Sequence, residues 1–122
     1  MNSGGNRMNI RTQQMNQLQK HVPQDFQDRL VTHLRQMYPE RLQNWDDDEL
    51  REFCQEGTER ARAFDVRTEY DISRFLEYRV FLGESFDRLG PPWLLAILYG
   101  DGSGTYKMDR LDECYRVRSH TR

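Results

Sequence analysis

The sequence predicts an all-α protein, a compact bundle of about five helices with a short apolar central helix. Apolar residues recur at intervals of three and four along most of the chain. No segment alternates apolar and polar residues as a half-buried strand does. Helix start and stop signals divide the chain into segments of helical length. Its 122 residues suit one domain with one core.

Composition excludes several classes of protein. The 18 basic and 20 acidic residues nearly cancel, so we expect no nucleic-acid partner. The longest apolar run, residues 93–99, is far shorter than the roughly 20 residues of a membrane span. Because the first residues lack an apolar signal segment, we expect a cytoplasmic protein without a membrane partner. Cys54 and Cys114 are then expected to be free thiols, although the sequence leaves a disulfide between them open.

We expect three regions along the chain. Residues 1–22 are a polar N-terminal tail with a possible short helix, residues 23–118 form the helical domain, and residues 119–122 are a basic C-terminal tail. The first helix of the domain is expected from Gln24 to Tyr38, between Pro23 and Pro39. Its apolar stripe consists of Phe26, Leu30, Leu34 and Met37.

The second helix has the clearest start signal. Asp46 with Glu49 three residues later predicts a capping box, and Trp45 with Leu50 predicts a hydrophobic staple. The apolar stripe of this helix consists of Leu50, Phe53, Cys54, Gly57, Ala61 and Phe64. Its small residues Gly57 and Ala61 would let another helix approach closely.

Three further segments complete the bundle. A third helix is expected to start at Thr68 and to end before Gly83, with Phe86 folded back onto the core. After Gly90-Pro91-Pro92, the apolar segment 93–99 predicts a short central helix that is covered on all sides. A Gly-Ser turn then leads to a final helix from about residue 106 to residue 117.

Arg79 occupies an apolar-stripe position of the third helix. Because a buried unpaired charge is costly, Arg79 is expected to pair with a carboxylate or to extend to water, and less favourably to face a partner protein.

An acidic edge follows the second helix. Glu49, Glu52, Glu56 and Glu59 are spaced three, four and three residues apart, so they line up beside the core stripe. A solvated helix face explains such an edge, and so does a docking surface for a basic partner. We take these four residues, with Arg79, as the candidate partner-binding residues.

Enzyme chemistry has little support in the sequence. His33 and Cys54 can meet in space as a Cys–His pair, but packing explains each residue equally well. The turn from Asp101 resembles the middle of a calcium loop, but Tyr99 and Arg110 stand where ligands are needed. We therefore expect no catalytic residues, no metal and no cofactor.

Five segments resemble a known group of proteins. They are residues 26–35 followed by Tyr38-Pro-Glu40, Gly57-Thr-Glu-Arg-Ala-Arg-Ala-Phe-Asp-Val66, Glu69-Tyr-Asp-Ile-Ser-Arg-Phe-Leu76, Phe81-Leu-Gly-Glu-Ser-Phe-Asp87 followed by Pro92-Trp93, and Lys107-Met-Asp-Arg-Leu111. In outline, residues 10–115 resemble small all-helical bacterial proteins encoded in type VI secretion loci, beside spike-tip proteins, effectors and effector adaptors. That group usually has an apolar residue at the position of Arg79, and commonly Pro or Asp at the positions of Glu84 and Ser85.

The resemblance implies a non-enzymatic, cytoplasmic accessory, an adaptor or co-chaperone. Its partner would be a protein: an effector, an effector adaptor or loading factor, or a spike-tip protein. The alternative is an immunity protein that neutralises a cognate effector.

Overall fold

The computed structural model describes residues 23–120, with side chains to residue 116. This part of the chain is helical and contains no strand, which confirms the all-α prediction. The predicted N-terminal tail, residues 1–22, lies outside the described residues. The last helix runs from residue 104 to residue 120, so it is longer at both ends than the final helix expected from about residue 106 to residue 117. The helices are α2 Gln24–Met37, α3 Asp47–Ala63, α4 Glu69–Leu82, α5 Phe86–Leu89, α6 Pro92–Tyr99 and α7 Gly104–His120.

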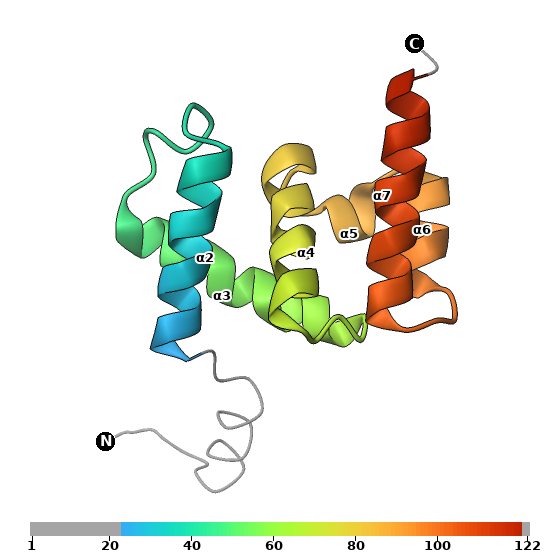
Figure 1. Cartoon of the computed structure of the whole chain (residues 1–122), viewed down its shortest axis with the longest axis horizontal. Helices are drawn as coiled ribbons and strands as arrows, with labels where there is room; N and C mark the ends of the chain where they lie inside the picture. Colours follow the sequence, from blue (N-terminus) through green and yellow to red (C-terminus); the bar gives the residue numbers. More distant parts are fainter. Residues whose placement is uncertain (1–22, 121–122) are drawn as a thin grey trace, which may run out of the picture.

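Helices α2, α4 and α7 stand side by side, and α3 crosses behind α2 and α4 (Figure 1). Helix α3 packs against α2 and α4, and α7 packs against α4 and α6. The core lies between these helices because each presents one apolar face to its neighbours. Its most deeply buried side chains include Leu34, Leu50, Ile72, Phe75, Leu76, Leu94, Leu98, Met108 and Leu111.

Local signals set the start of α3 as predicted. The Asp46 carboxylate accepts a hydrogen bond from the Glu49 backbone N–H at 2.8 Å, and the Glu49 carboxylate accepts one from the Asp46 N–H at 3.0 Å. This is the expected capping box. The Trp45 ring packs edge-on against Phe53, with ring centroids 5.3 Å apart. The beginning of α3 is therefore held by its own sequence.

Gly57 allows α4 to approach α3 closely, as predicted. A Cβ atom at this position would lie 2.2 Å from Leu76 Cδ2 and 3.1 Å from Arg79 Nη1. Any larger residue would push these two buried side chains of α4 away from α3.

A polar network joins α4 to α7. The Arg74 guanidinium pairs with Asp71 at 2.6 Å, Asp109 at 2.9 Å and Asp112 at 2.7 Å. Burial by itself would raise the pKa of Asp71, but hydrogen bonds from Arg74 and Thr105 outweigh burial and lower that pKa. The network therefore keeps a buried carboxylate charged.

The short helix α5 was not predicted. Thr68 caps α4 and Gly83 follows its end with φ of 111°, both as expected. The chain then forms the four residues of α5 and buries Phe86, which was expected to fold back onto the core. Helix α5 is too short for apolar periodicity to reveal it.

Helix α6 is not the central, fully covered helix that its composition predicts. Only Leu94 and Leu98 are buried in it, and Tyr99 is 63% exposed. It lies beside α7 at one end of the bundle (Figure 1). One face supplies the fully buried residues there, while Trp93, Leu95 and Ile97 are only partly buried against the core.

Candidate functional site

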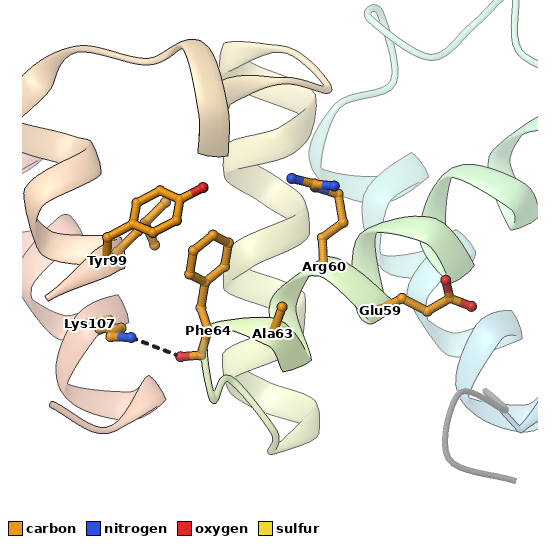
Figure 2. Close-up of a pocket in the computed structure, with 7 residues that line it drawn as sticks. Glu59, Arg60, Ala63, Phe64, Tyr99 and Lys107 are labelled. Carbon is orange, nitrogen blue, oxygen red and sulfur yellow. Dashed lines mark hydrogen bonds between the residues drawn. The ribbon is translucent and has the colours of Figure 1, made fainter. Parts of the chain in front are cut away.

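Three of the four predicted acidic residues line one surface hollow of about 300 Å³. Glu84, from the turn between α4 and α5, adds a fourth carboxylate. Glu59 instead lies beside a different pocket, near the end of α3 (Figure 2). The structure therefore divides the predicted acidic edge. We call the first site the acidic hollow, which is lined by Trp45, Glu49, Glu52, Phe53, Glu56 and Glu84.

Arg79 lies beneath the acidic hollow and is 3% exposed. Its Nη1 donates to the Phe53 carbonyl at 2.6 Å, and its Nη2 donates to a Glu56 carboxylate oxygen at 2.7 Å. Glu84 is 3.8 Å from the same nitrogen, and the guanidinium carbon lies 4.5 Å from the Phe53 ring centre. The predicted pairing with a carboxylate is confirmed. Because the guanidinium is buried, Arg79 contributes to this surface by holding Glu56 and Glu84 in place.

The acidic hollow keeps a surplus of negative charge. Four carboxylates line it, and Arg79 pairs with two of them. Glu49 is engaged with the backbone in the capping box. Glu52 is exposed, and within residues 23–116 no ion pair neutralises it. Carboxylates beside Trp45 offer an Arg or Lys side chain both ion pairing and contact with an aromatic ring.

An apolar hollow of about 490 Å³ adjoins the acidic hollow through their shared residue, Glu84. Its walls include Leu82, Phe86, Leu89 and Pro91. Leu89 is 82% exposed, so its side chain is accessible to a partner. This surface therefore presents acidic, aromatic and aliphatic groups side by side.

Sequence spacing did not reveal Glu84 as a residue of this site, because only the turn at Gly83 brings Glu84 close to α3.

The candidate Cys–His pair does not form. His33 Nε2 is 2.6 Å from a Glu77 carboxylate oxygen instead. Cys54 is fully buried, and burial raises the pKa of its thiol to about 12 despite the nearby Arg79 charge. A thiol with this pKa is not ionised at neutral pH, so Cys54 lacks the nucleophilic form. Cys54 and Cys114 are both free thiols.

The described residues contain neither a metal-binding cluster nor a membrane-spanning helix. No group of three or more His, Cys, Asp or Glu side chains there is arranged to hold a metal ion. Across the same range, no helix has the length and apolar character needed to cross a membrane.

Comparisons with family models, curated proteins and solved structures gave no significant match.

Proposed function

We propose that this protein is a non-enzymatic binding accessory that holds a basic segment of a partner protein at the acidic hollow. The observation that carries the proposal is the surplus of carboxylates around Trp45 and Phe53. Complementary charge speeds association and selects against acidic partners. The adjoining apolar hollow adds an anchor point for an aliphatic or aromatic side chain.

The resemblance to proteins of type VI secretion loci supports a more specific role. In that role, the protein is a cytoplasmic adaptor or co-chaperone, and its partner is an effector, the effector's loading factor or a spike-tip protein. An effector segment with Arg or Lys near an apolar residue would match both hollows. No chemistry on the bound partner is required of such an accessory.

The test is co-expression of the full chain with the product of each gene that flanks its own, followed by affinity purification. An adaptor should copurify with a loading factor, a spike-tip protein or a non-catalytic part of an effector. An immunity protein would instead cover the active site of an effector and protect cells that express it. Inhibition and protection would refute the adaptor role in favour of the immunity role, and failure to bind any flanking product would refute both.

A further inference from the structure

The pocket beside Glu59 lies where the end of α3 meets α6 and α7, and two cationic side chains line it. Its volume is about 490 Å³, and its walls include Arg60, Phe64, Leu98, Tyr99 and Lys107. Figure 2 shows Arg60 and Lys107 on opposite sides of the Phe64 and Tyr99 rings, with Glu59 directed away from them. The two rings pack edge to face, with their centroids 5.0 Å apart. The pocket therefore combines an apolar wall with a cationic side chain on each side, of which Arg60 already forms an ion pair with the buried Asp87 carboxylate.

Lys107 is the unusual residue of this pocket, because it is only 6% exposed. Its ammonium donates to the Phe64 carbonyl at 3.2 Å (Figure 2). That bond accounts for one of three N–H groups, and no carboxylate of residues 23–116 lies within ion-pair distance of the ammonium. The ammonium also lies 5.8 Å from the Phe64 ring centre. Hydrogen bonding from Arg67 does most to lower the pKa of Asp65, and the Lys107 charge lowers that pKa further. A buried ammonium without a paired anion is costly, so an anion beside it would be stabilised.

Arg60 supplies the second charge. Its Nε donates to Asp87 at 2.5 Å, and the Tyr99 hydroxyl donates to the Asp87 carbonyl at 3.0 Å. These contacts fix the positions of Arg60 and Tyr99. Within the described part of the chain, the terminal nitrogens of Arg60 have no hydrogen-bond partner. They remain available to a ligand at the edge of the pocket.

We propose that this pocket binds an organic carboxylate. The carboxylate pairs with Lys107, and the apolar part of the ligand lies against Phe64 and the exposed Tyr99. The volume falls within the range of roughly 300–1,000 Å³ that is common for small-ligand pockets. The apolar wall favours a carboxylate with an aromatic or aliphatic group over a small inorganic anion. This site is separate from the acidic hollow and does not depend on the function proposed for it.

The experiment is an NMR titration of the isotope-labelled full chain at neutral pH. Benzoate and N-acetylphenylalanine are the carboxylate probes, and their amides are the matched neutral controls. We expect saturable shifts at Phe64, Leu98, Tyr99 and Lys107 with the carboxylates and none with the amides. Tighter binding of N-acetylphenylalanine would assign the ligand to a peptide C-terminus, and tighter binding of benzoate would assign it to a free small molecule. Equal shifts with the amides, or shifts that do not saturate, would overturn the proposal.

A charge-removing variant provides the second test. Lys107→Gln keeps a donor for the Phe64 carbonyl but loses the charge, and it should weaken carboxylate binding about fivefold or more. Arg110→Gln is the control, since Arg110 lies on the same helix but pairs with Glu113, and it should bind as the wild type does. Unchanged affinity in a folded Lys107→Gln would overturn the proposal. If Lys107→Gln does not fold, the carboxylate and amide probes decide the question on the wild-type chain.

Discussion

Arg79 and Glu56 form one ion pair, but their replacement should have unequal effects on stability. The Arg79 side chain is 3% exposed and the Glu56 side chain is 60% exposed. We predict that Arg79→Ala lowers the free energy of unfolding by about 3 kcal/mol, whereas Glu56→Gln lowers it by about 1 kcal/mol or less.

The larger value follows from the contacts of Arg79. Its three buried methylene groups contribute about 0.8 kcal/mol each. The hydrogen bond to the Phe53 carbonyl and the contact with the Phe53 ring add about 1 kcal/mol each. Relief of the desolvation of the buried guanidinium offsets about 1–2 kcal/mol of this sum. In Arg79→Ala, Glu56 remains in water, so no buried charge is left unpaired. In Glu56→Gln, the buried guanidinium keeps Glu84 at 3.8 Å and gains an amide oxygen as acceptor, so its charge stays compensated.

The measurement is urea unfolding followed by circular dichroism, with thermal unfolding as a second measure. A loss of 3 kcal/mol corresponds to a fall in Tm of roughly 12 °C or more for a domain of this size. Arg79→Lys keeps most of the aliphatic stem and should fall between the wild type and Arg79→Ala. A cost below about 1 kcal/mol for Arg79→Ala, or equal costs for Arg79→Ala and Glu56→Gln, would refute the reasoning.

Three other predictions concern backbone contact, pH and thiol reactivity. Gly104→Ala should cost about 3 kcal/mol in urea unfolding, because the added Cβ would lie 2.0–2.5 Å from backbone atoms of the loop after α3. Gly83→Ala, which has a positive φ but no atom within 4 Å, should cost only about 1–2 kcal/mol, and the reverse order would contradict this account. Because the folded-state pKa of Asp71 is lowered, its stabilisation is present above pH of about 4 and is lost as the pH falls through the folded pKa. Asp71→Asn should therefore flatten the acid side of the stability curve, and an unchanged slope would refute this assignment. In a thiol-reagent assay on the native chain, Cys114 should react before the buried Cys54, and equal rates would show that Cys54 is not protected.

The helices that were predicted well have local signals. Asp46 with Glu49, and Thr68 at the start of α4, are short-range hydrogen-bonding patterns that do not depend on distant residues. The close approach of another helix at Gly57 could also be predicted, since a small residue on an apolar stripe leaves room for a neighbouring helix. The position of α6 could not be predicted from its sequence. The apolar composition of α6 indicates that it packs against other helices, but it does not indicate how many helices cover it. Such coverage is a property of the whole fold.

The sequence predicted only part of the candidate site, because spacing along one helix is a local signal and contacts between helices are not. Glu49, Glu52 and Glu56 share one helix, so their spacing alone placed them together. Glu84 joins them only through the turn after α4. The pocket at the end of α3 combines Arg60 of α3 with Lys107 of α7, two residues that are far apart in the sequence. Only the packing of α3, α6 and α7 brings their charges to one place.

Glu52 offers the cleanest test of the acidic hollow, since Glu49 caps α3 and Glu56 pairs with Arg79. The matched control is Asp101→Lys, which makes the same change of charge in the exposed turn between α6 and α7. The most direct measurement is the Kd of each variant for the copurified partner, at two salt concentrations. We predict that Glu52→Lys weakens binding about tenfold or more and reduces its salt dependence, while Asp101→Lys binds as the wild type does. An unchanged Kd and salt dependence for Glu52→Lys would contradict the proposal that the acidic hollow holds a basic partner.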